Sequence, residues 1–415
     1  MGRASEAGTI ALKVVGQDTR KTARAAPVSA STGGRGAPRP SLDPHKLQTG
    51  MDAAIPVIAA AAEADDRARQ FPHVAIAALR EAGALRAPLP LDHGGLGVLT
   101  SADGALPGLD LLMRIGHASL PVGRLYEGHA NALALICRYG TPEQIARAAD
   151  QVGAGGLFGV WNTQTAEGLH LRTDADGMHL DGGKTYASGA GALAHPLVTA
   201  HLEDGSRLIL LPRIPSAELE QRSDLSGWNV HGMRASLTGS FDFSGLRVCS
   251  SDIVGVAGDY DRQPMFSAGA WRFAAVQAGG VARVLDEMRA HLRATGRGTD
   301  PHQSARLGTA AMACETANLW VRRAAVLVES GRADAADQTI AYVNLARLAV
   351  EKAGLEVLEL SHRSVGLAGF LATSPLERIT RDLATYLRQP GPDRALEGAA
   401  SHVLEADSPA TELWV

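Results

Sequence analysis

The sequence of 415 residues contains only three cysteines, and this scarcity limits the kinds of site that it can hold. They are Cys137, Cys249 and Cys314, which are odd in number, far apart and not part of a Cys-x-x-Cys pair. Such spacing indicates neither a disulfide framework nor a thiolate metal site. We therefore predict no metal centre and a reducing, cytoplasmic location.

Long apolar runs and an excess of basic charge are also missing. No stretch is long enough to span a bilayer as a helix. The formal net charge of −4 gives no sign of a protein that binds a phosphate backbone. We expect neither a membrane span nor a nucleic-acid partner.

A Gly-x-Gly-x-x-Gly turn between a strand and a helix is missing as well. The pair Gly279-Gly280 falls inside a helical pattern, where small residues favour close helix packing over phosphate binding. Any dinucleotide must therefore be held in another way.

The segment 1–45 has too few apolar residues for a core and is rich in Ala, Arg, Gly, Ser, Thr and Pro. Burial of so little apolar surface does not offset the entropy of ordering the chain. The segment is basic but lacks the apolar run and cleavage site of a secretory signal. We expect a disordered extension.

Beyond this segment the hydrophobic period changes twice. Residues 46–152 repeat apolar positions at helical spacing, and Thr141 before Pro142 is typical of a helix start. Residues 153–262 alternate apolar and polar positions around Asp-Gly turns, which predicts an antiparallel β domain, as a barrel or a small stack of sheets. Residues 263–410 predict a four-helix-type bundle of long helices. The fold class is α+β multidomain.

One bundle helix is unusually apolar. From Thr309 to Ala325 it carries apolar residues around much of its circumference. This pattern indicates burial at the bundle centre or at a subunit interface.

Four stretches in this order resemble those of acyl-CoA dehydrogenases: Tyr139–Gln144 (YGTPEQ), Leu180–Ala200, His231–Val248 and Ser364–Leu383. The resemblance implies an FAD-dependent oxidoreductase that dehydrogenates an acyl thioester between its α and β carbons. It also implies an acyl-CoA or other acyl-carrier substrate, a homodimer or homotetramer, and FAD held between the β and helical units. An electron-accepting or flavin-reducing partner is expected with it.

Three residues of the β domain match positions that lie near the flavin in that family: Trp161, Tyr186 and Ser188. The indole can stack on the isoalloxazine ring or fill a β core. The Ser188 hydroxyl can donate to a flavin heteroatom such as N5, whereas the bland interpretation of this stretch is a β-turn.

Further positions of the helical bundle also match the family. The resemblance places Arg272 on the substrate side of the cavity, although a surface salt bridge is an equal alternative. It assigns flavin binding to Arg293, Arg297, Gly366, Gly369 and Phe370, with a solvated loop and a helix–helix turn as the alternatives.

The carboxylate base of the family is missing from its two usual positions, which here hold Pro390 and Trp271. The nearest acids are Asp393 and Glu397. Asp393 is our candidate for the base, although its place after Gly-Pro also suits a helix N-cap. Three functions stay open: a dehydrogenase with a displaced base, a flavin monooxygenase that uses flavin reduced by a separate protein, or a non-catalytic homologue that serves binding or assembly.

Overall fold

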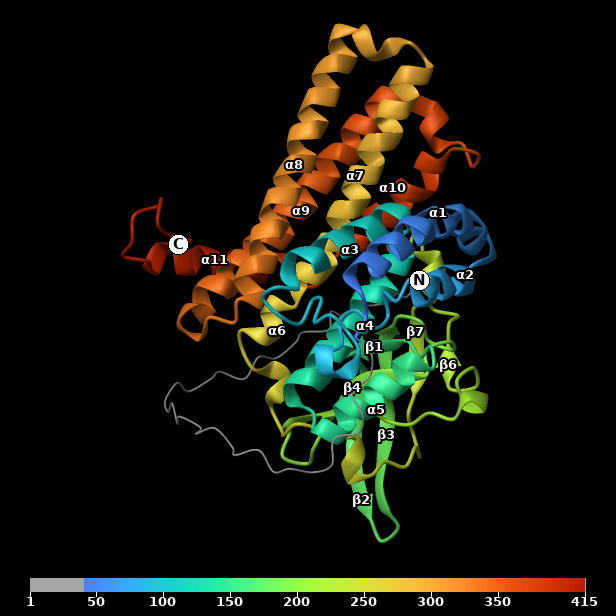
Figure 1. The fold of residues 1–415 in the computed structure, drawn as a ribbon, viewed down its shortest axis with the longest axis vertical. Coiled ribbons are helices and arrows are strands. Elements are labelled where there is room, and N and C mark those ends of the chain that lie inside the picture. Colours follow the sequence, from blue (N-terminus) through green and yellow to red (C-terminus); the bar gives the residue numbers. More distant parts are fainter. Residues whose placement is uncertain (1–40, 415) are drawn as a thin grey trace, which may run out of the picture. The chain divides into compact units, whose positions relative to one another are not determined.

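The computed structural model describes residues 41–414, which form helices, then strands, then helices again (Figure 1). This order confirms the predicted α+β class. Residues 1–40, most of the expected disordered extension, lie outside the described residues. The first helices are α1 (Pro44–Ala68), α2 (His73–Glu81), η1 (Leu91–His93), α3 (Ala105–Ala118), α4 (Leu120–Tyr139) and α5 (Pro142–Gly153).

The start of α5 has the predicted cap. The Thr141 hydroxyl accepts the backbone N–H of Gln144 at 3.3 Å, and Gln144 Oε1 accepts the Thr141 N–H at 2.9 Å. This reciprocal pair satisfies two N–H groups that the first helical turn leaves free. Gln144 Nε2 also donates to the Ile253 carbonyl at 2.6 Å, so the cap fastens α5 to the strands.

The strands of the described chain form one eight-stranded sheet with the order β6-β7-β3-β2-β4-β5-β8, and β1 pairs with β4. Their bounds are β1 (Phe158–Trp161), β2 (Gln164–Asp174), β3 (Gly177–Ala187), β4 (His195–His201), β5 (Arg207–Leu210), β6 (Ser223–Asp224), β7 (Gly239–Asp242) and β8 (Ile253–Val254). The connections contain η2 (Ser216–Glu218), η3 (Arg234–Ser236), η4 (Ser250–Asp252) and η5 (Asp259–Asp261).

Both predicted hairpins, β2–β3 and β4–β5, are antiparallel pairs, as expected. The sheet as a whole is mixed, which corrects the prediction of a purely antiparallel domain. The reason is that β1 runs parallel to β4, with Phe158 opposite His195. Alternating hydrophobicity shows which side chains share a face, but it carries no information about the direction of a distant partner strand.

The C-terminal part contains α6 (Met265–Ala268), α7 (Ala270–Ala294), η6 (Arg297–Thr299), α8 (Pro301–Glu329), η7 (Ala333–Ala335), α9 (Ala336–Val365), η8 (Gly366–Phe370), α10 (Pro375–Tyr386) and α11 (Pro392–Glu405). The long helices α7, α8 and α9 lie side by side (Figure 1). A Cβ at Gly279 of α7 would lie 2.1 Å from the Met113 carbonyl oxygen of α3. The glycine therefore permits the close helix packing that the sequence predicts.

The apolar helix α8 is buried on one side only. Ala313 and Ala317 face the interior, whereas Met312 and Leu319 are 66% and 57% exposed. Burial at the bundle centre therefore does not explain its outer face, and a subunit interface stays a prediction.

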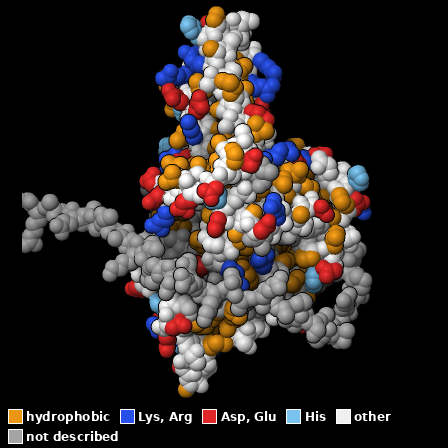
Figure 2. Space-filling model, turned by 90° about the vertical axis from the view of Figure 1, so that its left-hand side faces the viewer, with side chains coloured by type: hydrophobic (Ala, Val, Ile, Leu, Met, Phe, Trp, Pro, Cys, Tyr) orange, Lys and Arg blue, Asp and Glu red, His pale blue; other side chains and the backbone are white. Residues whose placement is uncertain are grey.

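Charged groups of both signs are interspersed over the face of the molecule in Figure 2. Among residues 41–414, the longest helices carry too many polar side chains for any of them to cross a bilayer. All three cysteines are free thiols.

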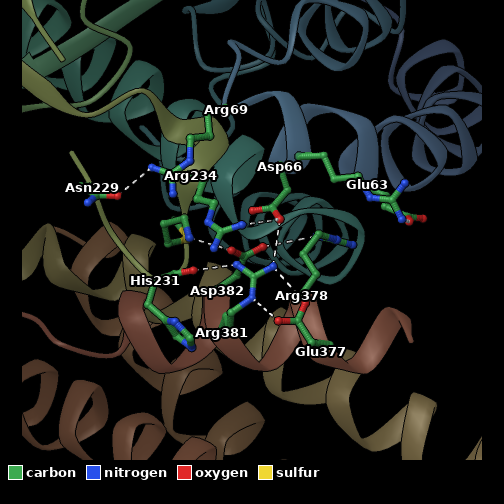
Figure 3. A network of polar contacts seen from close by, with 12 residues as sticks. Glu63, Asp66, Arg69, Asn229, His231, Arg234, Glu377, Arg378, Arg381 and Asp382 are labelled. Carbon is green, nitrogen blue, oxygen red and sulfur yellow. Dashed lines mark hydrogen bonds and ion pairs between the residues drawn. The ribbon is translucent and has the colours of Figure 1, made fainter. Parts of the chain in front are cut away.

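A buried network of charged side chains fastens α10 to α1 and to the loop before β7 (Figure 3). Arg381 Nη2 on α10 donates to Asp66 Oδ2 on α1 at 2.9 Å, and Arg381 Nη1 donates to the His231 carbonyl at 2.6 Å. The next residue, Asp382, accepts the backbone N–H of Met233 at 2.6 Å. Two consecutive residues of one helix thus join three parts of the chain.

The loop reaches α10 because position 232 is glycine. A Cβ at Gly232 would lie 2.1 Å from the Arg381 carbonyl oxygen. Burial raises the pKa of Asp382 to about 6, although the Arg378 guanidinium 3.3 Å away acts in the opposite direction. This carboxyl is therefore held at a position where its charge is poorly solvated.

Candidate functional site

The end of β3 presents an aromatic side chain to solvent. Tyr186 has φ +51°, and the pairing of β3 with β7 shifts register between Lys184 and Ala187. A shift of this kind changes the direction in which a side chain points, and the Tyr186 ring is 63% exposed. A left-handed backbone is strained at an aromatic residue, and such strain gathers at functional sites. The end of β3 is therefore a candidate ligand surface.

Ser188 is the second residue after Tyr186 and is buried. Its Oγ accepts from Arg124 Nε at 3.2 Å and from Thr238 Oγ1 at 3.1 Å. Because both neighbours donate in this arrangement, the hydroxyl proton of Ser188 is available to a further acceptor. The turn after β3 thus combines an exposed ring with a hydroxyl donor.

Helix α4 supplies a charged pair to this turn. Arg124 and Glu127 are one helical turn apart and form an ion pair. Asn131 Nδ2 donates to Glu127 Oε2 at 2.5 Å, and the Tyr386 hydroxyl lies 3.5 Å from Glu127 Oε1. Burial raises the pKa of Tyr386, so its hydroxyl stays protonated and donates. Three donors therefore engage the Glu127 carboxylate.

A second ion pair continues this polar chain. Arg272 donates to Asn131 Oδ1 at 3.0 Å and to Glu329 Oε1 at 2.6 Å. Trp271 Nε1 donates to the same Glu329 oxygen at 3.2 Å. Burial raises the pKa of Glu329, whereas the Arg272 charge lowers it. Arg272 thus belongs to an interior ion pair rather than to the surface salt bridge considered from the sequence.

Trp161 lies in the core of the sheet. Its ring centroid is 5.2 Å from that of Phe241 and 6.3 Å from that of Phe243. Its Nε1 donates to the Ser188 carbonyl at 2.9 Å. The side chain fills the β core and supports the turn after β3, and a direct contact with a flavin stays a prediction.

A second group of predicted residues lies at the other end of the bundle. Arg297 follows α7 and donates to the Ser364 carbonyl, at the end of α9, at 3.4 Å. Phe370 is exposed, and its ring centroid lies 4.5 Å from that of His362. The other members are Arg293, which is exposed, Gly366, which ends α9 with φ +70°, and Gly369, which is buried. This group lies far from β3 in Figure 1.

Asp393 belongs to neither group. It is exposed on α11, which packs along α9 and lies away from the strands in Figure 1. Gly391, and not Asp393, is the N-cap of this helix, so the capping interpretation is wrong. Asp393 instead lies in the first turn, where its charge favours the helix dipole.

Sequence analysis missed the pair Arg124 and Glu127 together with Asn131 and Tyr386. The sequence held one signal for Arg124 and Glu127. They are the charged residues in the first turns of α4, whose sequence there, LPVGRLYEGHANALAL, is largely apolar. An i, i+3 pair of opposite charge is usually a solvated helix face. Only the packing of α10 against α4 shows that the Glu127 carboxylate of this pair is interior.

A cavity of about 680 Å³ lies nearby, between α2, the end of α5 and the start of β4. Its lining includes Phe71, Arg80 and His195. The predicted site residues do not line it, so it is separate from the surface around Ser188.

Two family models match this chain. The model described as "Acyl-CoA dehydrogenase, N-terminal domain" matches residues 52–156, and the one described as "Acyl-CoA dehydrogenase, C-terminal domain" matches residues 261–393. Together these matches cover more than half of the sequence.

Characterised relatives match shorter segments. The 3-sulfinopropanoyl-CoA desulfinase of Variovorax paradoxus is 31% identical over 149 residues, which are 34% of this chain and 36% of that protein. The amino sugar nitrososynthase DnmZ of Streptomyces peucetius is 29% identical over 200 residues, 47% of this chain and 49% of that protein. The chain thus matches less than half the length of each of these relatives.

One solved structure matches almost the whole described fold. It is the dibenzothiophene monooxygenase TdsC from Paenibacillus sp. A11-2, with a TM-score of 0.76 and 20% identity over 89% of this chain and 100% of that chain. The FMN-bound form of TdsC matches with a TM-score of 0.77. At this identity the likeness establishes the fold alone.

Proposed function

This chain belongs to the acyl-CoA dehydrogenase family, and we propose that it is a flavin-dependent monooxygenase that uses flavin reduced by a separate partner. The family membership accounts for the fold. The kind of reaction has to be argued from the side chains around the end of β3.

The residues at that end fit a flavin. Tyr186 offers an exposed aromatic face, and Ser188 offers a proton to an acceptor atom of the ring. Gly189 and Gly191 have positive φ values, which glycine adopts without strain, so the turn after β3 bends sharply. A reduced flavin supplies two electrons to dioxygen, so that one oxygen atom enters the substrate and the other leaves as water. The chain's own residues hold the ring, orient the substrate and exclude bulk water.

The observation that carries the proposal concerns the carboxylates. At the two positions where the family resemblance places the base for dehydrogenation, this chain has Trp271 and Pro390. The carboxylates of Glu127 and Glu329, within the polar chain that starts at Ser188, are each paired with an arginine. Because a guanidinium and further donors occupy the oxygens of both carboxylates, neither is free to turn toward a substrate α-proton. Oxygen transfer from dioxygen needs no base for an α-proton.

The names of the relatives also favour a reaction other than dehydrogenation. The names of two relatives describe desulfination and nitrososynthesis. Neither of these names describes removal of hydrogen from an acyl chain.

Dehydrogenation of an acyl-CoA or another acyl thioester is the second candidate. The two matching family models, both named for acyl-CoA dehydrogenases, favour it. This reaction requires a base, and Asp393 stays the candidate for it. In the assembled protein the exposed Asp393 carboxylate would then have to reach the substrate.

The remote group around Phe370 supports an oligomeric site. Arg293 and Arg297 can bind phosphate oxygens, and Gly366 and Gly369 permit close approach to a flat ligand. The end of the bundle that holds them lies away from β3 in Figure 1, so we infer that they do not contact a flavin bound at the end of β3 of the same chain. A homodimer or homotetramer would bring them to the FAD of a neighbouring copy.

The visible spectrum of the purified protein tests the proposal. We expect bound or added flavin to bleach with dithionite but not with anaerobic butyryl-CoA, and the bleached protein to reoxidise with oxygen. Bleaching by the acyl-CoA alone would favour dehydrogenation. Protein that takes up neither FAD nor FMN would contradict both enzymatic readings and leave a binding or assembly role.

A pair of variants locates the flavin. Ser188→Ala should weaken flavin binding about tenfold, which corresponds to about 1.4 kcal/mol for one lost hydrogen bond. Ser401→Ala on the exposed side of α11 should leave it unchanged. Equal affinities in the two variants would move the flavin away from β3.

A further inference from the structure

The neighbours of Arg124 hold its guanidinium in place but accept only some of its N–H donors. Its Nε donates to Ser188 and its Nη1 to Glu127, whereas Nη2 has no acceptor among the described residues. A guanidinium carries five N–H donors in a fixed fork, so the Nη2 group and the second Nη1 hydrogen stay available. The Arg124 side chain therefore has N–H donors beside Ser188 that a ligand can engage.

The exposure of Arg124 separates it from the other interior arginines. Its side chain is 28% exposed, whereas those of Arg272 and Arg381 are 2% and 9% exposed. The two buried arginines lie in ion pairs that bridge distant helices. Arg124 instead is partly accessible to solvent where its Nε meets Ser188, which is the second residue after the exposed Tyr186.

Glu127 fixes the direction of this guanidinium. Its own carboxylate is almost completely buried and accepts from Arg124, Asn131 and Tyr386. Because these donors come from α4 and α10, the carboxylate has little freedom to turn. It therefore acts as a positioning residue that keeps the Arg124 fork aimed past Ser188.

An arginine fork next to a hydroxyl selects a particular class of ligand. Two oxygens of one carboxylate or sulfinate group match the spacing of the guanidinium donors, and the charge strengthens each hydrogen bond. A neutral amide of the same shape offers one acceptor and no charge. The site should therefore distinguish an anion from its neutral isostere.

We propose that Arg124 recognises the anionic end of the substrate, a carboxylate or sulfinate group, and holds it beside Ser188. This inference rests on the proposed flavin site at the end of β3. The inference concerns the substrate class of that site. The substrate would carry an anionic group that binds Arg124 and, elsewhere in the same molecule, the atom that is oxidised.

Titration calorimetry with benzoate, benzenesulfinate and benzamide tests the inference on the purified full-length chain, with and without added flavin. We expect both anions to bind the wild type and benzamide to bind at least tenfold more weakly. Arg124→Gln should lose this preference, so that benzoate binds no better than benzamide. Arg394→Gln, an exposed arginine of α11, should keep the wild-type preference.

Arg124→Lys is a second variant that controls for a failure of Arg124→Gln to fold. It keeps the charge but loses the fork, and we expect benzoate binding between that of wild type and Arg124→Gln. Unchanged preference for benzoate in both Arg124 variants would overturn the proposal, as would a wild type that binds benzamide as well as benzoate.

The flavin measurement separates this proposal from the function on which it rests. If Arg124→Gln binds flavin normally and loses only benzoate, the anion belongs to the substrate. If Arg124→Gln loses flavin and the wild type shows no anion preference, the guanidinium serves the flavin itself and the substrate assignment fails. Anion preference that depends on Arg124 in a protein that never takes up flavin would retain the anion site and defeat the monooxygenase.

Discussion

Arg272 on α7 and Glu329 at the end of α8 form an ion pair of 2.6 Å in which both side chains are almost completely buried. The Arg272 Nε has no hydrogen-bond partner, so the guanidinium depends on Glu329, Asn131 and the Leu99 carbonyl for its solvation. Removal of one charge from such a pair leaves the other uncompensated in the interior.

Glu329→Gln should therefore lower the free energy of unfolding by about 3–5 kcal/mol. Urea unfolding followed by circular dichroism measures the loss. The double variant Arg272→Met, Glu329→Leu replaces both charges with apolar groups of similar volume and should recover most of it. A double variant as unstable as Glu329→Gln would show that the pair contributes through its geometry and not through charge compensation.

Two glycines in long helices should respond to alanine in opposite directions. Gly279→Ala places a methyl group against the Met113 carbonyl and should destabilise the protein by about 1–3 kcal/mol. Gly308→Ala on α8 meets no atom within 4 Å and should stabilise it by about 0.5–1 kcal/mol. Melting temperatures of the two variants check the prediction, and a shift of the same sign in both would refute it.

The charge of Asp382 should make stability depend on pH. Because burial raises its folded pKa from 3.8 to about 6, the folded chain holds a proton that the unfolded chain has lost between these values. The contribution of this carboxyl is complete below about pH 4 and is lost as the pH rises through about 6. At about 1.4 kcal/mol per pKa unit, the loss is roughly 3 kcal/mol.

Asp382→Asn removes this titration. The unfolding free energy of the wild type, measured relative to that of the variant, should therefore fall between pH 4 and pH 7. The slope is the informative quantity, because the amide also changes the hydrogen bonds to Met233 and Arg378. Parallel pH profiles of the two proteins would count against a raised pKa at Asp382.

Tyr186→Gly tests whether the strained turn serves ligand binding. Glycine adopts a positive φ freely, and the ring that it removes is largely exposed, so we expect stability to rise by up to about 1 kcal/mol. Flavin affinity should fall at least tenfold. Arg69→Gly, at another exposed left-handed position, should gain similar stability and leave flavin binding intact.

Much of the fold follows from local patterns. The Thr141 cap and the two hairpins each depend on residues a few positions apart, and the sequence alone predicts all three. The direction of β1 depends on β4, more than 30 positions further along the chain, and alternation of side chains does not specify it. The error therefore lies in the long-range pairing and not in the strands.

The candidate site likewise contains residues that a local stretch of sequence indicates and residues that only long-range contacts reveal. Ser188 and Tyr186 were predicted from a stretch of sequence that resembles a known family. The pair of Arg124 and Glu127 was missed because its significance depends on Tyr386, which lies far along the chain but next to Glu127 in space. A carboxylate whose donors come from two remote helices leaves no local pattern.

The contacts of Arg381 and Asp382 join α10 of the bundle to α1, the first helix of the described chain, and to the loop around Met233. Excision of the helical bundle would therefore remove the Arg381 cation from Asp66, leaving only Arg234 at 3.7 Å, and would release the segment that follows β6 from Asp382. The three parts are not interchangeable modules that evolution or an engineer can swap one at a time. We therefore expect the described chain to unfold as one cooperative unit.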